Sequence, residues 1–184
     1  ASKYNMAKKN PNNYCEFVAD LNLTNVHRVY HDTQYGFPIE NDNELFGRLL
    51  LEINQAGLSW TTILNKQKNF RKAYSTYNIQ RVANYNKKDV EELLNNPGII
   101  RNKLKVNAAI YNANKILLIQ KEYGSFKFWL QKNNNISLEA WIKLFKQTFK
   151  FTGPEITREF LTSTGILKGA HIISCPTFKN LIKV

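Results

Sequence analysis

Apolar residues recur at helical spacing along most of the chain after residue 42. Asp42 can cap a helix, and the apolar positions that follow it fall on one face until Gly57; they are Leu45, Phe46, Leu49, Leu50 and Ile53. Ser59 can cap a second helix, which carries Trp60, Ile63, Leu64, Phe70 and Tyr74. The pattern therefore predicts two consecutive amphipathic helices in this part of the chain.

The remainder of the chain continues this pattern. Pro97 and Gly98 interrupt it, and a long helix is predicted to follow from Lys103 to Tyr123. Shorter helices are predicted at Ile79–Tyr85, Asp89–Leu94, Ser125–Leu130, Ser137–Phe149 and Glu155–Thr164. The sequence lacks the alternation of apolar and polar positions that is typical of β-strands, so we expect an all-α protein.

The same pattern predicts a single helical domain. Residues 1–13 are polar and are expected to form a disordered tail, whereas no linker rich in Gly, Ser or Pro divides residues 14–184. The longest apolar cluster, Leu49–Leu51, ends at Glu52 and is far shorter than the roughly 18 residues that a membrane span needs. The N-terminus does not resemble a secretory signal, and two cysteines are too few for a disulfide scaffold. We therefore expect a protein of the cytosol, without a membrane partner. We also expect a monomer.

The chain is strongly basic, with 26 Lys and Arg against 14 Asp and Glu and a formal net charge of +12. Such a charge is typical of proteins that bind the phosphate backbone of nucleic acids. Genome composition is a competing explanation, because runs such as Asn133–Asn135 and Asn86–Lys88 consist of residues with AT-rich codons. Charge alone leaves nucleic-acid binding open.

Four of the five Cys and His residues lie near the two ends of the sequence: Cys15, His31, His171 and Cys175. The last two are spaced i, i+4 and can reach one ion from a single helical turn. Two thiolates and two imidazoles form a closed tetrahedral zinc site of the structural type, which here would join the two ends of the domain. The alternatives are free buried cysteines with surface histidines, or a disulfide, which a cytosol disfavours.

Two neighbouring segments carry a family resemblance. Tyr30–Gly36 (YHDTQYG) and Leu51–Trp60 (LEINQAGLSW) closely resemble the DNA-3-methyladenine glycosylase I family. The resemblance covers residues 15–178 and includes Asn95–Arg101, Tyr123–Phe126, Phe149–Pro154 and His171–Pro176. It implies a structural zinc ion, with the four Cys and His residues near the chain ends as its ligands.

The resemblance implies a DNA repair enzyme of the helix-hairpin-helix superfamily. Such a glycosylase flips N3-methyladenine out of double-stranded DNA and hydrolyses its N-glycosidic bond, which leaves an abasic site. The turn at Asn95–Arg101 is then expected to offer backbone N–H groups to a DNA phosphate. The DNA-binding residues expected there are Pro97, Gly98, Ile99 and Arg101. Without the resemblance, the same turn is an ordinary connection between two helices.

The resemblance also implies a pocket for the methylated base. Glu52 is expected to recognise the base as the catalytic residue, and Tyr30 and Trp60 to form pocket walls. The other residues expected to contact the substrate are Phe17, His27 and Tyr35. N3-methyladenine is a cation, and both aromatic faces and a carboxylate attract a cation. From the residues alone, a solvated Glu52 and core-packed Phe17 and Tyr35 are the competing interpretations, and His27 departs from the tyrosine common in the family.

Several alternatives to this activity follow from the sequence. Glu155–Phe160 carries charged residues where the family commonly has apolar ones, which allows a catalytically altered protein that binds damaged DNA without cleaving it. A bifunctional glycosylase/lyase would use Lys103 or Lys105 as its nucleophile, and a zinc-stapled regulator would bind another protein instead of DNA. Because Arg101–Gln120 contains no Asp or Glu, we expect monofunctional hydrolysis without an activating aspartate.

Overall fold

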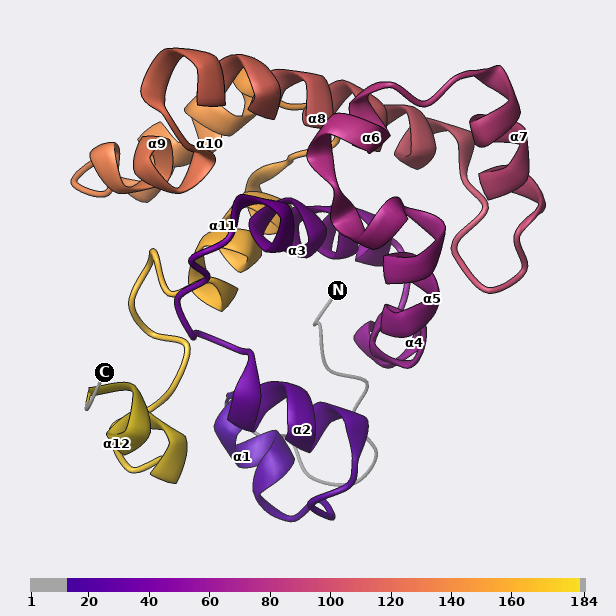
Figure 1. The fold of residues 1–184 in the computed structure, drawn as a ribbon. Coiled ribbons are helices and arrows are strands. Elements are labelled where there is room, and N and C mark those ends of the chain that lie inside the picture. The colour runs from indigo at the N-terminus through magenta and orange to yellow at the C-terminus, as the bar shows by residue number, and fades with distance from the viewer. Residues whose placement is uncertain (1–12, 183–184) are drawn as a thin grey trace.

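The computed structural model describes residues 13–182, and within this range it contains helices and turns but no β-strand (Figure 1). The predicted all-α fold is therefore confirmed. In chain order the helices are α1 (Tyr14–Ala19), α2 (Val26–Thr33), α3 (Asp42–Gln55), α4 (Trp60–Asn65), α5 (Gln67–Ala73), the 3-10 helix η1 (Ser75–Tyr77), α6 (Ile79–Ala83), α7 (Lys87–Asn95), α8 (Lys103–Tyr123), α9 (Phe126–Lys132), α10 (Leu138–Thr148), α11 (Pro154–Ser163) and α12 (Pro176–Ile182). The tail predicted for residues 1–13 lies outside the described residues except for Asn13, whose side chain caps α1.

Helix α3 runs through the middle of the molecule (Figure 1). Every residue from Leu45 to Asn54 is buried, and these include the charged Arg48 and Glu52. A helix with neighbours on all sides buries its polar residues as well as its apolar face. The predicted apolar stripe is therefore only one side of a helix that is surrounded along most of its length.

Helix caps explain where α3, α4 and α9 begin. Asn41, rather than the predicted Asp42, caps α3, because its side chain accepts hydrogen bonds from backbone N–H groups of the first turn. Asp42 instead accepts hydrogen bonds from the backbone N–H groups of Phe126 (2.9 Å) and Lys127 (3.0 Å) at the start of α9. The Ser59 side chain accepts a hydrogen bond from the backbone of α4, so the predicted cap of that helix is confirmed.

Helix lengths agree with the sequence pattern to different degrees. The long helix predicted for Lys103–Tyr123 is confirmed as α8, which ends at Gly124 in the left-handed region (φ 89°). The single helix predicted from Ser59 to Tyr74 is wrong, because the chain bends at Lys66 (φ −102°, ψ 2°) and forms α4 and α5. Helices α1 (6 residues), α2 (8 residues) and α12 (7 residues) were not predicted.

The helices flank α3 on two sides (Figure 1). Helices α8, α9 and α10 lie on one side, whereas α1, α2 and α12 lie on the other. Helix α11 packs against α3 and α10, and α4 packs against α2 and α3. A cluster of large aromatic residues fills the space between α9, α10 and α11; it consists of Phe126, Trp129, Trp141, Phe145, Phe149 and Phe160. Among residues 13–182, no helix is long and apolar enough to cross a membrane.

Candidate functional site

Aromatic rings from α1, α2, α4 and the segment after α2 meet below α3. The Tyr30 ring contacts the Trp60 ring edge-on at 5.3 Å between centroids and the Tyr35 ring at 5.9 Å. At the other end of the same group, the ring centroids of Phe17 and His27 lie 5.1 Å apart. Tyr14 connects the two ends, since its ring lies 6.3 Å from that of Tyr30 and stacks at 6.0 Å on Phe17. The structure therefore brings together all five aromatic or imidazole residues that the sequence suggested for a base pocket.

Tyr14 and Thr61 also hold His27 from both sides. The Tyr14 hydroxyl lies 2.9 Å from His27 Nδ1, and Thr61 Oγ1 lies 2.7 Å from His27 Nε2. The histidine, which is 5% exposed, is thereby tied to α1 and α4 at once. Sequence reasoning missed Tyr14 and Thr61, and the position of Tyr14 next to Cys15 was the only signal that could have pointed to it.

Glu52 lies on α3 and is fully buried, which excludes the interpretation of a solvated flanking carboxylate. Arg48, one helical turn earlier, is 7% exposed and places its guanidinium 5.3 Å from the centroid of the Tyr30 ring. Because residues four apart share one face of a helix, Glu52 lies on the same face of α3 as this arginine. Burying a carboxylate costs free energy, so its place on this face marks a candidate functional group.

A cavity of about 500 Å³ lies beside this cluster, on the side of Arg48. The Nη1 of Arg48 donates a hydrogen bond to the carbonyl of Ser163 at 3.0 Å. Across the cavity, Arg71 pairs with Glu44 through two hydrogen bonds of 2.7 and 2.8 Å, and these hydrogen bonds hold the pKa of Glu44 below its ordinary value. None of the predicted pocket residues is among the cavity's described lining residues.

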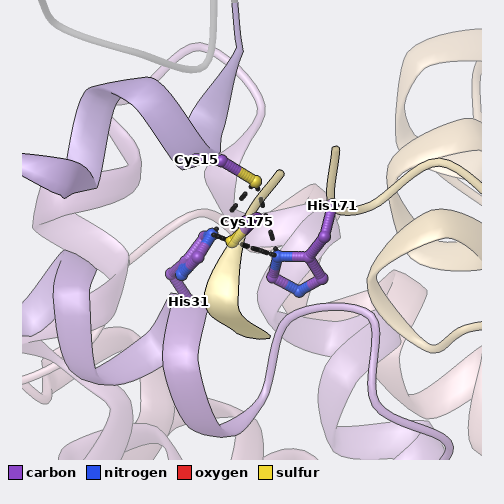
Figure 2. Close-up of side chains that lie close together, drawn as sticks. All are labelled: Cys15, His31, His171 and Cys175. Atoms are coloured by element: carbon purple, nitrogen blue, oxygen red, sulfur yellow. Dashed lines mark hydrogen bonds between the residues drawn. The ribbon is translucent and has the colours of Figure 1, made fainter. Parts of the chain in front are cut away.

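The four predicted metal ligands converge on one point (Figure 2). All four are buried, and their ligand atoms lie within 4.8 Å of one another. The Sγ of Cys15 lies 3.3 Å from His31 Nε2 and 3.5 Å from His171 Nδ1, and the two nitrogens are 3.0 Å apart. The Sγ of Cys175 lies 3.8 and 3.9 Å from the same two nitrogens. The edges of a tetrahedron with Zn–S and Zn–N bonds of ordinary length are about 3.3–3.8 Å. The five distances lie within or close to this range, so small shifts of the side chains would let the donor set hold a zinc ion.

Neighbouring oxygen atoms orient both histidines toward this centre. The Nδ1 of His31 lies 2.7 Å from a carboxylate oxygen of Asp32, and the Nε2 of His171 lies 2.6 Å from the Tyr35 carbonyl. In each ring the outer nitrogen can donate its hydrogen, which leaves the inner nitrogen with a lone pair for a metal. Burial lowers the pKa of both histidines and raises the pKa of the Cys15 thiol to about 11. A bound cation would favour the thiolate instead.

Two side chains hold the turn between α7 and α8: one on α5 and one from the residue that precedes α5. Asn69 Nδ2 donates a hydrogen bond to the Gly98 carbonyl at 3.1 Å, and Lys66 Nζ reaches the Pro97 carbonyl at 3.4 Å. The Gly98 N–H donates to the side-chain oxygen of Asn96, and the Ile99 N–H donates to the Asn96 carbonyl. Pro97 has no N–H. The expectation that these three residues offer backbone N–H groups to a phosphate therefore does not fit this turn. Arg101, in contrast, is exposed at its end.

Lys105 connects α8 to the segment that leads into α4. Its Nζ donates hydrogen bonds to the carbonyls of Asn54 (2.9 Å) and Ala56 (2.7 Å) at the end of α3. Desolvation lowers the pKa of this buried amine. Lys103, the other lysine considered as a nucleophile, is exposed. The end of α3 and the start of α8 are thus joined just after the α7–α8 turn.

Comparisons with known proteins agree with this arrangement. A family model described as methyladenine glycosylase matches residues 21–141. The chain is 32% identical to DNA-3-methyladenine glycosylase 1 of Escherichia coli (strain K12) over 166 residues, which cover 80% of this chain and 88% of that protein. It is 28% identical to DNA-3-methyladenine glycosylase of Haemophilus influenzae, with 80% and 89% covered.

Solved structures are similar over most of the chain. The 3-methyladenine DNA glycosylase I of Staphylococcus aureus, solved to explain 3-methyladenine recognition, superposes with a TM-score of 0.76 at 31% identity, covering 83% of this chain and 90% of that one. A tyrosine-to-phenylalanine variant of 3-methyladenine DNA glycosylase I in complex with 3-methyladenine gives a TM-score of 0.77 at 30% identity, with 83% and 91% covered. The chain therefore belongs to the methyladenine glycosylase family.

Proposed function

We propose that this protein is a DNA repair glycosylase that releases 3-methyladenine from alkylated double-stranded DNA. Family membership supports the proposal. The observation that carries it is the fully buried Glu52. This carboxylate shares a face of α3 with Arg48, whose guanidinium lies over the Tyr30 ring of the aromatic cluster. A cationic methylated base needs this combination, because aromatic faces and a carboxylate stabilise a positive charge in a dry site.

The reaction needs little acid or base catalysis. In N3-methyladenine the base carries a positive charge, so the bond between its N9 and the sugar C1′ is already weakened. When that bond breaks, its electron pair neutralises the base, and the oxygen of a water molecule bonds to C1′ while the water gives up a proton. In this proposal Glu52 recognises the base, Tyr30 and Trp60 form the walls, and Phe17, His27 and Tyr35 complete the pocket.

We infer that the hydrolysis is monofunctional. Lys105, the buried lysine near the α7–α8 turn, already donates hydrogen bonds to two carbonyls at the end of α3, which a Schiff-base nucleophile would have to break. No acidic residue occurs in Arg101–Gln120 to activate such a nucleophile. Borohydride reduction during the reaction should therefore trap no covalent complex with DNA, and a trapped complex would identify a lyase.

We also infer a structural zinc ion held by Cys15, His31, His171 and Cys175. The tetrahedral fit of the four donor atoms and the oxygen partners of both histidines support this site. When bound, zinc would join α1 and α2 to the segment before α12 and would leave no position for a substrate, since four protein ligands fill a tetrahedral site. Its role would therefore be to hold the aromatic cluster in place, because α1 and α2 carry most of that cluster.

For DNA binding we propose that α7, the turn and α8 act as a helix-hairpin-helix element. Pro97, Gly98 and Ile99 shape the turn, and the exposed Arg101 contacts a phosphate of the duplex. The net charge of +12 supports a nucleic-acid partner. We propose that the protein acts as a monomer on chromosomal DNA in the cytosol.

The test is chromatography of the bases that the purified protein releases from N-methylated duplex DNA. We expect release of 3-methyladenine and at least about a 100-fold slower release by Glu52→Gln, because the amide cannot balance the charge of the base. Glu139→Gln, which changes an exposed glutamate on α10, is the matched control and should behave as wild type. Thermal unfolding of each variant checks that it is folded.

The same assay distinguishes the glycosylase from the second candidate function, which is binding of damaged DNA without cleavage. A catalytically altered protein that only recognises damage would bind methylated duplex but release no base. That result would contradict the glycosylase proposal and keep the DNA-binding one. Full activity in Glu52→Gln would remove Glu52 from the site while leaving the reaction unchanged.

A further inference from the structure

Phe151 is an exposed aromatic residue in a strained backbone conformation. It lies in the turn between α10 and α11 with φ of 62°, in the left-handed region that a phenylalanine rarely adopts. Its side chain is nevertheless 39% exposed. Burial of the ring therefore does not explain why a bulky residue occupies a position that suits glycine or asparagine better.

The residues on both sides of Phe151 hold it in this conformation. The side chain of Asn112, which is 1% exposed, donates to the Lys150 carbonyl (3.0 Å) and accepts from the Lys150 N–H (2.8 Å). The buried Thr152 donates its hydroxyl to the Phe145 carbonyl at 3.0 Å. A strained residue whose neighbours are fixed so firmly is typical of functional sites rather than of flexible loops.

The ring of Phe151 faces the amine of Lys105, which in turn bonds to the segment that connects α3 to α4. The Nζ of Lys105 is 6.0 Å from the centroid of this ring and donates hydrogen bonds to the carbonyls of Asn54 and Ala56. Leu58, two residues after Ala56, is 38% exposed. Because Lys105 belongs to the first turn of α8, the ring also lies near the turn that precedes this helix.

We propose that Phe151 is a further DNA-contacting residue, whose ring stacks on an unstacked base next to the flipped nucleotide. The inference rests on the proposed glycosylase function. Flipping a nucleotide leaves neighbouring bases with exposed faces, and an exposed aromatic ring can cover one of them. The hydrogen bonds of Lys150 and Thr152 fix the backbone that carries this ring. Lys105 sets the position of the ring relative to the α3–α4 segment.

The test compares Phe151→Asn with Phe151→Tyr, which keeps an aromatic ring. Phe128→Ala is the matched control, since Phe128 is an exposed phenylalanine on α9 (51%). We would measure the Kd for a duplex with a tetrahydrofuran abasic analogue beside 2-aminopurine, the fluorescence of that 2-aminopurine, the affinity for free 3-methyladenine, and thermal unfolding.

Phe151→Asn should bind the abasic duplex about tenfold more weakly than wild type, because base–aromatic stacking contributes this order of affinity. The 2-aminopurine should lose the fluorescence change that binding of wild type causes. Affinity for free 3-methyladenine should stay the same, and the Tm should not fall, since asparagine tolerates the left-handed conformation. Phe151→Tyr and Phe128→Ala should behave as wild type.

Wild-type affinity in Phe151→Asn would overturn the proposal, and so would a Tm that falls together with affinity, because the ring would then support only the fold. The failure of the proposed function gives a different result: wild type would release no 3-methyladenine, whatever Phe151→Asn does to duplex binding. A wild-type protein that binds no abasic duplex would contradict both.

Discussion

Single residues give the candidate site its chemical character through buried polar groups beside aromatic rings. Glu52 and Arg48 lie on one face of α3, and the guanidinium of Arg48 covers the ring of Tyr30. On the far side of the cluster, the hydroxyl of Tyr14 and that of Thr61 hold His27 between them. The orientation of His27 thus depends on side chains that no sequence motif contains.

Tyr14→Phe tests this arrangement. The variant removes the hydroxyl that meets His27 Nδ1 but keeps the ring that stacks on Phe17. We expect a loss of about 1 kcal/mol in the free energy of unfolding from the lost hydrogen bond. We also expect several-fold slower release of 3-methyladenine, because the imidazole would no longer be fixed. Urea unfolding and the base-release assay measure the two effects.

Tyr123→Phe, at the end of α8, is the control for Tyr14→Phe. If Tyr14→Phe lost stability but released base at the wild-type rate, the orientation of His27 would not matter for the reaction.

At the scale of elements, the connection between α3 and α8 links the α7–α8 turn to the proposed base site. Glu52 lies on α3, Trp60 begins α4, and the segment between them is held by Lys105 of α8. Two hydrogen bonds from Lys105 thus join the start of α8 to the residues that precede Trp60. This connection joins the part of the protein proposed to bind the backbone to the part proposed to bind the base.

Lys105→Met should break this connection while keeping the length of the side chain. Two buried carbonyls would lose their donor, so we expect the free energy of unfolding to fall by about 1–3 kcal/mol. Release of 3-methyladenine from duplex DNA should slow more than binding of the free base weakens, because the variant separates the turn from the pocket. Chemical denaturation measures the stability, and the base-release assay and the binding of free 3-methyladenine measure the two effects on function.

Lys103→Met changes an exposed lysine on the same helix and should leave stability unchanged. Equal stability in Lys105→Met and Lys103→Met would show that the two hydrogen bonds contribute nothing to the fold.

At the scale of the whole molecule, the Cys and His cluster brings residues 140 or more positions apart into contact. Cys15 and His31 belong to α1 and α2, whereas His171 and Cys175 precede α12. Helix α12 buries only Thr177 among its described residues, so a metal that joins its preceding segment to α1 and α2 would add stability at this end of the domain.

We expect one tightly bound zinc ion per chain, measured by elemental analysis of the purified protein. Removal by a chelator should lower the Tm and release α1 and α2, whereas restoring zinc should reverse both changes. Because the ligands bind as a thiolate and as neutral imidazoles, zinc should be lost as the pH falls and protons compete. Purified protein that contains no zinc and keeps its Tm in chelator would contradict this site.

The sequence alone predicted features that depend on local spacing. Helical periodicity and a serine before an apolar run were sufficient for the all-α class, for Lys103–Tyr123 and for the Ser59 cap, because they reflect interactions within a few residues. Residue type and position singled out the four Cys and His residues, and motif resemblance pointed to five residues of the aromatic cluster; the structure brings both sets together.

Only the tertiary structure decided what lies against each side of an element. Asp42 has the residue type and position of a helix cap, yet its side chain bonds to α9. Glu52 is fully buried because other helices cover the face that a periodicity pattern leaves to solvent. Tyr14 contacts Tyr30 and His27 from another helix, and Phe151 meets Lys105 from a distant turn. These contacts join residues far apart in the chain, and spacing along a sequence carries no information about them until the helices are packed.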